Sequence, residues 1–209
     1  MKLRIATPDD AKKLQKLYAW YVIHSAATFE WDVPDVDEFR RRIESTLKDY
    51  PYIVVEEDGE IMGYAYVSPF KGRKAYEWSA ETSIYIAHES RQKGYGNLLY
   101  KALEKIMPLQ NVCNLYACIA RPTREDDPHL SMASICFHQL LGYRLCAEFE
   151  GCAVKYDTWY DMVWMGKRIA PLEEHPKPFL PFSSLNRGEV EKILERLCDQ
   201  YEEKREEHR

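Results

Sequence analysis

A short segment of the chain combines glycines with basic side chains in a way that suits an anionic ligand. It reads Arg91-Gln92-Lys93-Gly94-Tyr95-Gly96 and lies between a strand-like stretch and a helix-like stretch. Glycines allow a tight turn and a close approach of the backbone, and the free N–H groups at the start of a helix attract a pyrophosphate. The segment lacks the third spaced glycine of a dinucleotide fingerprint and the Gly-Lys-Ser/Thr of a P-loop. Taken alone, it is equally consistent with a glycine turn that carries solvated basic side chains.

Glu81 and His138 are the second group of residues whose types suit chemistry. Glu81 belongs to an alternating, strand-like pattern, and His138 belongs to a helix-like stretch. A carboxylate can take a proton from a nucleophile such as an amine, and a histidine can share that task or return a proton to a leaving group. On residue type alone, a salt-bridged strand glutamate and a core histidine are the more frequent roles.

Hydrophobic periodicity predicts the elements that must position these residues. Strands are expected over residues 3–6, 52–57, 60–67, 80–86, 113–120, 143–149 and 159–165. Helices are expected after Thr7, after Asp35, over residues 98–106 and 132–141, and after Asn186. This order predicts an α+β fold with a central, mostly antiparallel sheet flanked by helices, and not a run of βαβ units.

The composition of the chain changes at Pro171. Prolines recur at positions 171, 176, 178 and 181, which predicts an extended linker, and an amphipathic helix is expected beyond it. The sequence therefore predicts a domain over residues 1–170, followed by a linker and an accessory helix over residues 171–209. The apolar stripe of that helix must be covered by the domain, by a second subunit or by a partner; it consists of Val190, Ile193, Leu194, Leu197 and Tyr201.

Composition and charge exclude several classes of protein. The chain has 209 residues, of which 45% are hydrophobic, so it is neither disordered nor collagen-like. A net charge of −5 argues against nucleic acid as a partner, because phosphate neutralisation needs an excess of basic groups. The six cysteines and six histidines show no zinc-binding spacing, so we expect no metal and buried, reduced thiols. The sequence shows no signal-like or membrane-spanning segment, which predicts a soluble, cytoplasmic protein.

Several motifs resemble one enzyme family. The stretch from Ile84-Tyr85-Ile86 through Gly96 to Leu98-Leu99 is similar to the acetyl-CoA-binding motif of the GNAT N-acetyltransferases. A narrower resemblance is to the phosphinothricin N-acetyltransferase subfamily, and it extends from about Leu3 to Met165. The matching residues are Lys71 to Trp78, Glu81, Ser83, Tyr85, Phe137-His138, Leu141-Gly142-Tyr143, Lys155, Trp159, Asp161 and Trp164.

This resemblance implies a mixed α/β GNAT fold with a splayed sheet and assigns roles to matching positions. Glu81 and His138 would be the catalytic residues. The residues implied to bind acetyl-CoA are Ile84, Tyr85, Ile86, Arg91, Gln92, Lys93, Gly94, Tyr95, Gly96, Asn97, Ser131 and Ser134. The residues implied to bind the acceptor are Phe29, Glu30, Tyr76, Lys155 and Trp159, although packing explains Lys155 and Trp159 as well.

The resemblance also implies an activity. The expected reaction transfers the acetyl group of acetyl-CoA to the primary amine of a small amino-acid-like acceptor, such as phosphinothricin or methionine sulfoximine, by direct attack on the thioester. The alternatives are a GNAT enzyme acting on a protein N-terminus or a polyamine, and a non-catalytic acyl-CoA-binding module. A homodimer is expected. The chain departs from the subfamily at Ser131, where an asparagine is usual, at Ala153, where a glycine is usual, and in the longer charged loop 122–129.

Overall fold

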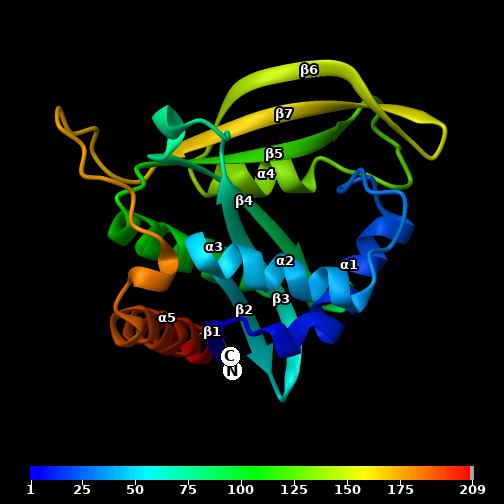
Figure 1. Cartoon of the computed structure of the whole chain (residues 1–209). Helices are drawn as coiled ribbons and strands as arrows, with labels where there is room; N and C mark the ends of the chain where they lie inside the picture. Colours follow the sequence, from blue (N-terminus) through cyan, green and yellow to red (C-terminus); the bar gives the residue numbers. More distant parts are fainter. Residues whose placement is uncertain (208–209) are drawn as a thin grey trace.

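The computed structural model describes residues 1–207 and contains a seven-stranded sheet with helices on both faces (Figure 1). The strands are β1 (Lys2–Ile5), β2 (Tyr52–Glu57), β3 (Glu60–Pro69), β4 (Ser79–Ile86), β5 (Asn114–Pro122), β6 (Arg144–Lys155) and β7 (Thr158–Arg168). The α-helices are α1 (Ala11–His24), α2 (Val36–Asp49), α3 (Tyr95–Ile106), α4 (Ala133–Leu140) and α5 (Arg187–Glu207). Residues 208 and 209, which end the predicted segment 171–209, lie outside the described residues.

The order of the elements follows the prediction from sequence, and the main difference lies in the last two strands. These were expected over residues 143–149 and 159–165, but β6 and β7 are longer and form one extended hairpin. Tyr156 and Asp157 both have positive φ angles, 52° and 54°, and make the tight turn between them. A two-residue turn of this kind lets both strands continue to the tip of the hairpin.

The sheet divides at its centre. Its strand order is β1-β2-β3-β4-β5-β7-β6, and every neighbouring pair is antiparallel except β4 and β5, which are parallel. β4 pairs with β5 at only three positions, from Ser79 opposite Asn114 to Glu81 opposite Tyr116. Beyond Glu81, β4 stays paired with β3 as far as Ile86 but has separated from β5. This separation confirms the splayed sheet and leaves one edge of β4 open.

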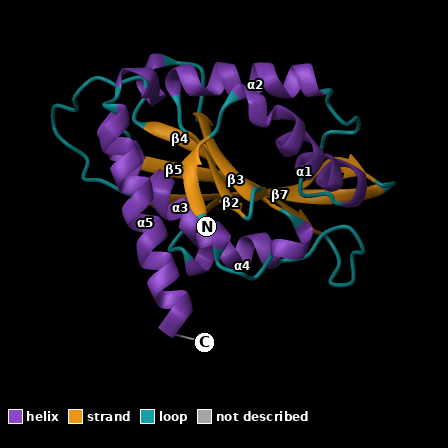
Figure 2. Ribbon diagram, turned by 90° about the horizontal axis from the view of Figure 1, so that it is seen from below, coloured by secondary structure: helices purple, strands orange, loops and turns teal. Residues whose placement is uncertain are grey.

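Each face of the sheet has its own apolar core, because alternate residues of a strand point to opposite faces. Along β2, Tyr52 and Val54 pack under α1 and α2. The residues between and after them, Ile53 and Val55, pack against the other core, which contains most of α3. Figure 2 shows the result, with α2 on one side of the sheet and α4 on the other.

The C-terminal helix α5 closes the second core. Its residues Val190, Leu194 and Cys198 are buried, and the helix packs against α3 and β1 (Figure 2). The sequence left open whether the domain, a second subunit or a partner covers the apolar stripe of this helix. The structure shows that the domain of the same chain covers it. The proline-rich stretch before α5 is held by hydrogen bonds from side chains outside the strands; for example, the Trp78 indole donates to the carbonyl of Lys177 at 2.7 Å.

The strand β6 lies at the edge of the sheet and is irregular. Its register with β7 shifts twice, between Leu145 and Ala147 and again between Phe149 and Ala153. Such β-bulges bend and twist a strand. Most of β6 is exposed, and within residues 1–207 no further strand pairs with its outer edge.

The cysteines depart from the prediction of buried thiols. Cys113 and Cys198 are buried, but four others are exposed: Cys118, Cys136, Cys146 and Cys152. Cys146 and Cys152 lie on the edge strand β6, and Cys118 lies on β5 beyond its separation from β4, so neither neighbourhood supplies a covering layer. Within residues 1–207, no group of His, Cys, Asp and Glu side chains is arranged to hold a metal ion. None of the helices in the same range has the length and apolarity that a membrane crossing requires.

The packing of α5 leads to a stability prediction. Leu194 is 1% exposed, so Leu194→Ala should lower the free energy of unfolding by about 2–5 kcal/mol through lost burial and the remaining cavity. Urea denaturation measures this change, with Glu195→Ala, at an exposed position of the same helix, as the control. A loss below about 0.5 kcal/mol for Leu194→Ala, as for a surface change, would show that α5 does not pack on the sheet domain in solution.

Candidate active site

Glu81 lies at the point where the sheet divides. It is the last residue of β4 that has partners on both sides, Ser68 on β3 and Tyr116 on β5. Burial raises the pKa of the Glu81 carboxyl, and the positive charge of Lys71 opposes that rise only in part. A carboxyl with a raised pKa beside an open strand edge is suited to accept a proton from a bound nucleophile.

His138 is buried on the face of the sheet opposite to the Glu81 side chain. Its Nδ1 is 2.7 Å from the carbonyl oxygen of Ser134, which only accepts, so Nδ1 carries the proton. Burial lowers the pKa of His138, which favours the neutral ring, and Nε2 then accepts a hydrogen bond of 2.7 Å from the Tyr100 hydroxyl. Both ring nitrogens are therefore bonded within the protein.

A buried hydrogen-bond chain joins His138 to the strand that carries Glu81. Thr82 Oγ1 is 3.1 Å from both the Tyr100 hydroxyl oxygen and the carbonyl oxygen of Tyr116. Because Tyr100 donates its proton to His138, the Thr82 hydroxyl is the donor to both of these acceptors and shares its single proton between them. Thr82 follows Glu81 in β4, so their side chains point to opposite faces. The structure thus does not bring the side chains of Glu81 and His138 together on one face, but links His138 to the dividing point through Thr82 and Tyr100.

The glycine-rich segment forms a turn into α3, as its sequence predicts. Gln92 and Gly94 have positive φ angles of 62° and 86°, and α3 begins directly afterwards. Among the described residues, no side chain caps the N-terminus of α3. The first N–H groups of α3 are therefore open to an anion. A Cβ atom at Gly96 would lie 3.0 Å from the Phe137 ring, so a side chain there would require this ring to shift, and glycine favours the close approach of α3 to α4.

The side chains of Arg91 and Tyr95, beside and at the end of this turn, are held by contacts elsewhere in the protein. The guanidinium of Arg91 lies over the rings of Trp20 (4.8 Å) and Tyr21 (5.1 Å) on α1. The Tyr95 hydroxyl donates to the carboxylate of Glu57. Lys93 accepts a hydrogen bond at its carbonyl oxygen from the Tyr201 hydroxyl of α5. For Tyr95 the main chain, and not the side chain, is therefore what the turn offers to a ligand.

The backbone groups of Ile84, Tyr85 and Ile86 are not equally available to a ligand at the open edge of β4. The Tyr21 hydroxyl donates to the carbonyl of Ile86 at 2.6 Å and accepts from its N–H at 3.1 Å, so this end of the open edge is occupied. Ile84 lies two residues before Ile86 in the strand, so its N–H and C=O groups point to the same open edge. The ring of Tyr85 packs among those of Tyr18 and Tyr21 instead.

Lys155 holds the loop that carries Phe29 and Glu30. Its Nζ donates to the carbonyls of Ser25 (2.9 Å) and Thr28 (2.7 Å), and the side chain is buried. Burial lowers the pKa of Lys155. Phe29 packs near the Tyr160 ring, and Glu30 forms an ion pair of 2.8 Å with Arg42. Lys155 therefore positions the loop through these two hydrogen bonds.

Tyr76, Trp159 and Ser131 lie at the surface. Tyr76 packs edge-on against Phe70, which stacks on Tyr116 opposite Glu81, so Tyr76 lies at the border of the site. Trp159 is 61% exposed near the tip of the β6–β7 hairpin. Ser131 Oγ accepts from the N–H of Ala133 at 3.4 Å at the start of α4, and Ser134 contributes its carbonyl to His138.

Sequence reasoning missed a tyrosine-lined cavity of about 550 Å³ between α2 and the sheet. Tyr52, Tyr64 and Tyr66 line it from the strands, and Arg42 lies on its helical side. The alternation of Tyr64 and Tyr66 in β3 was the signal for this surface, because both must lie on one face of the strand. Tyr21 and Tyr100 were also missed, since their partners are distant in sequence.

Known proteins are similar to this chain over most of its length. Residues 3–164 match the acetyltransferase (GNAT) domain family. The phosphinothricin N-acetyltransferase of Streptomyces viridochromogenes is 29% identical over 185 residues, 88% of this chain and 96% of that protein. The L-methionine sulfoximine/L-methionine sulfone acetyltransferase of Salmonella typhimurium is 27% identical, over 85% of this chain and 98% of that protein. The crystal structure of a GNAT superfamily phosphinothricin acetyltransferase from Sinorhizobium meliloti with acetyl-CoA has a TM-score of 0.73 at 28% identity, over 86% of this chain and 97% of that chain.

The raised pKa of Glu81 predicts how its replacement changes stability with pH. Below the ordinary glutamate pKa of about 4.3, Glu81 is protonated in both the folded and the unfolded chain, so its ionisation does not affect stability. As the pH rises from there through the raised pKa, the unfolded state ionises first, and the folded wild type loses stability. Glu81→Gln cannot ionise, so its Tm relative to wild type should be higher at pH 7 than at pH 4, by about 2–4 °C per kcal/mol of relieved desolvation.

Thermal unfolding of the two proteins at both pH values measures this difference. Glu60→Gln, at an exposed position of the neighbouring strand β3, controls for the loss of a surface carboxylate. An equal Tm difference at pH 4 and pH 7 for Glu81→Gln would contradict the desolvated state of Glu81.

Proposed function

The chain belongs to the GNAT acetyltransferase family, and from this premise we propose that it transfers the acetyl group of acetyl-CoA to the primary amine of a small amino-acid-like acceptor. The observation that carries the proposal is the place of Glu81. This carboxyl with a raised pKa lies where β4 leaves β5, and the open strand edge runs from there toward the turn into α3.

The residues at the open edge fit acetyl-CoA as the co-substrate. The backbone of Ile84 is suited to pair with the amides of the pantetheine arm, as an added strand would. The turn from Gln92 to Asn97 and the uncapped start of α3 are suited to the pyrophosphate. The similar Sinorhizobium meliloti enzyme was crystallised with acetyl-CoA, which supports this assignment. When bound, acetyl-CoA supplies an acetyl group activated as a thioester.

Glu81 acts as the general base. An ammonium group is not nucleophilic, so a proton must leave the acceptor before or during its attack on the thioester carbonyl. The raised pKa of Glu81 makes its carboxylate a stronger base than an ordinary exposed glutamate. It takes the proton directly or through one water molecule.

His138 is a positioning residue in this proposal. Its neutral ring accepts from Tyr100, so it orients the Tyr100 hydroxyl toward itself and leaves the hydroxyl oxygen facing Thr82. A thiol has an ordinary pKa of about 8.5, so a departing thiolate needs little help from an acid. The chain from His138 to Thr82 thus fixes β4 at the dividing point, and we expect it to matter less for the attack than Glu81.

Charge near Glu81 favours an amino acid over a polyamine as the acceptor. The exposed Lys71 lies close enough to Glu81 to affect its pKa, and its ammonium is suited to the carboxylate of an amino acid. The same charge would repel the second ammonium of a polyamine. The names of the similar phosphinothricin and methionine sulfoximine acetyltransferases support this class of acceptor. Phe29 and Glu30, on the loop that Lys155 holds, border the acceptor.

A screen of acceptors tests the function. The purified protein is mixed with acetyl-CoA and, in separate assays, with amino acids, phosphinothricin, methionine sulfoximine, a peptide with a free N-terminus, or spermidine, and the released thiol is measured. Release with an amino acid or its analogue supports the proposal, and release only with peptide or spermidine identifies an alternative acceptor. Tight binding of CoA without thiol release from any amine would identify a binding module instead.

We also propose that the enzyme is a cytoplasmic homodimer. Free thiols suit a reducing compartment, and all six cysteines of the chain are unpaired. The β6–β7 hairpin exposes several large apolar side chains, which is typical of a surface that another subunit covers; they are Leu145 (59%), Phe149 (46%) and Trp159 (61%).

The base assignment predicts the effect of Glu81→Gln on activity. The change should lower kcat by about 10² to 10⁴, because the group that accepts the proton is lost. Binding of acetyl-CoA should be nearly unchanged, and the acidic limb of the kcat/KM profile, which in wild type reflects the raised pKa of Glu81, should flatten. Steady-state kinetics across pH measure both effects, with Glu60→Gln as the matched control. Near-full activity of Glu81→Gln with an unaltered acidic limb would show that another group is the base.

The dimer predicts a molar mass in solution of about twice the 24.7 kDa of the chain. Light scattering measures it, and Phe149→Glu should shift the mass toward that of the monomer, because burying an unpaired charge is unfavourable. Leu172→Glu, at a position that is 57% exposed in the linker, is the control and should leave the mass unchanged. A monomeric wild type would contradict the dimer.

A further inference from the structure

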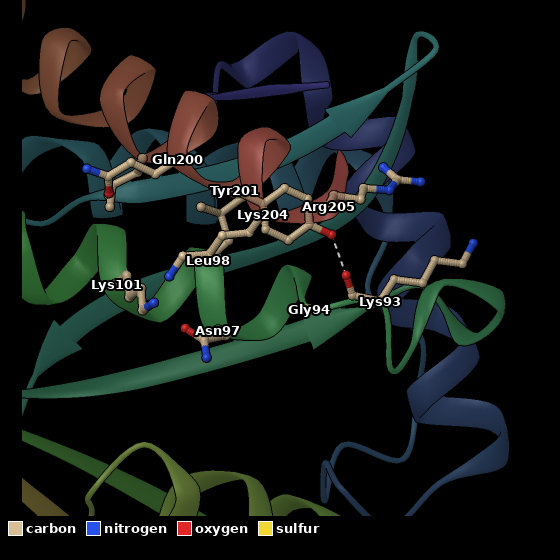
Figure 3. Close-up of a pocket in the computed structure, with 10 residues that line it drawn as sticks. Lys93, Gly94, Asn97, Leu98, Lys101, Gln200, Tyr201, Lys204 and Arg205 are labelled. Atoms are coloured by element: carbon tan, nitrogen blue, oxygen red, sulfur yellow. Dashed lines mark hydrogen bonds between the residues drawn. The ribbon is translucent and has the colours of Figure 1, made fainter. Parts of the chain in front are cut away.

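A second cavity lies behind the glycine-rich turn, between α3 and α5. Its volume is about 390 Å³, and α5, which forms one wall, lies beyond the residues 3–164 that match the family. Figure 3 shows side chains of the two helices on either side of this cavity, with Gly94 at one end. None of the residues that line it belongs to the open edge of β4.

The lining of this cavity is positively charged. It contains four cationic side chains, from Lys93, Lys101, Lys204 and Arg205, and two amides, from Asn97 and Gln200, but no carboxylate. The chain as a whole has a net charge of −5, so this cluster is a local reversal of the protein's charge. A concave site lined by one sign of charge concentrates ions of the opposite sign.

The cations differ in what already holds them. Arg205 forms an ion pair of 2.6 Å with Glu57, which fixes its position and offsets part of its charge. Within residues 1–207, the side chains of Lys93 and Lys101 have no hydrogen bond or ion pair. Two ammonium groups without a counter-ion in the protein, together with amide donors, suit a phosphate group, which accepts several charge-assisted hydrogen bonds.

The cavity also shares a wall with the turn. The Tyr201 hydroxyl donates to the carbonyl of Lys93, and a Cβ atom at Gly94 would lie 3.1 Å from the Tyr201 ring. A group bound between α3 and α5 would therefore contact the back of the segment whose front faces the proposed pyrophosphate site.

We propose that the cavity between α3 and α5 binds a phosphate group, with Lys101 of α3 as the principal donor and Lys204 of α5 on the opposite wall. Two sources have this chemistry: the 3′-phosphate of CoA, an assignment that rests on the proposed function, and a separate phosphorylated molecule. The two helices hold their donors on opposite walls, so a phosphate between them also bridges α3 and α5.

Isothermal titration calorimetry on the full chain tests the site with three probes: CoA, 3′-dephospho-CoA and inorganic phosphate. The test variants are Lys101→Gln and Lys204→Gln. Each variant should weaken binding of the probe that occupies the cavity about three- to tenfold. Added salt should weaken binding of that probe to the wild type, because salt screens the charges. Lys105→Gln on α3 and Lys192→Gln on α5 are matched controls, since both lysines are exposed on the same helices but outside the cavity.

The pattern of losses identifies the source. If the 3′-phosphate occupies the cavity, the test variants weaken CoA binding and leave 3′-dephospho-CoA binding unchanged. If the ligand is separate, they weaken binding of inorganic phosphate and leave both coenzymes unaffected. Equal affinities of test and control variants for all three probes would overturn the site. Failure of the wild type to bind either coenzyme would instead contradict the proposed function, while the phosphate arm would still test the cavity.

Discussion

The short pairing between β4 and β5 is the constraint on which the rest of the molecule depends. Because the two strands share only three positions, the edge of β4 opens directly after Glu81. The separation has to be maintained against the tendency of strands to pair. At the dividing point, the Thr82 hydroxyl donates to the carbonyl of Tyr116. At the far end, the Tyr21 hydroxyl bonds the N–H and C=O groups of Ile86, so side chains satisfy the backbone hydrogen bonds at both ends of the gap. What remains between them is a length of strand edge that a ligand can complete.

Desolvation acts on both sides of this gap and has opposite effects on the two candidate residues. Burial disfavours charge, so it raises the pKa of Glu81 and lowers the pKa of His138. The carboxyl becomes a better base, whereas the imidazole becomes a fixed, neutral hydrogen-bond acceptor. One physical cause thus separates a group suited to move a proton from a group suited to hold its neighbours in place.

Local features of the structure could be predicted from the sequence, and long-range contacts could not. Asp35 caps α2 by accepting from the N–H of Glu38, and the Asp58-Gly59 turn has the positive φ angles that its residues favour. The turn into α3 was likewise visible, since its glycines and its helix are adjacent in the chain. Lys155, in contrast, bonds the carbonyl of Ser25 across 130 positions, so its burial depends on packing that no local pattern encodes. The exposed thiols were mispredicted for the same reason, because exposure at an edge follows from strand order.

The two bulges in β6 limit the addition of strands from other molecules to this edge of the sheet. A long edge strand with apolar side chains is a template on which further strands add, and identical strands stacked in register build a fibril. Such stacking needs a regular ladder, but the register of β6 breaks after Leu145 and again after Phe149. Glu148 lies between these breaks and brings a charge to the strand. The edge therefore keeps its apolar side chains for contact while its main chain resists propagation into an amyloid-like assembly.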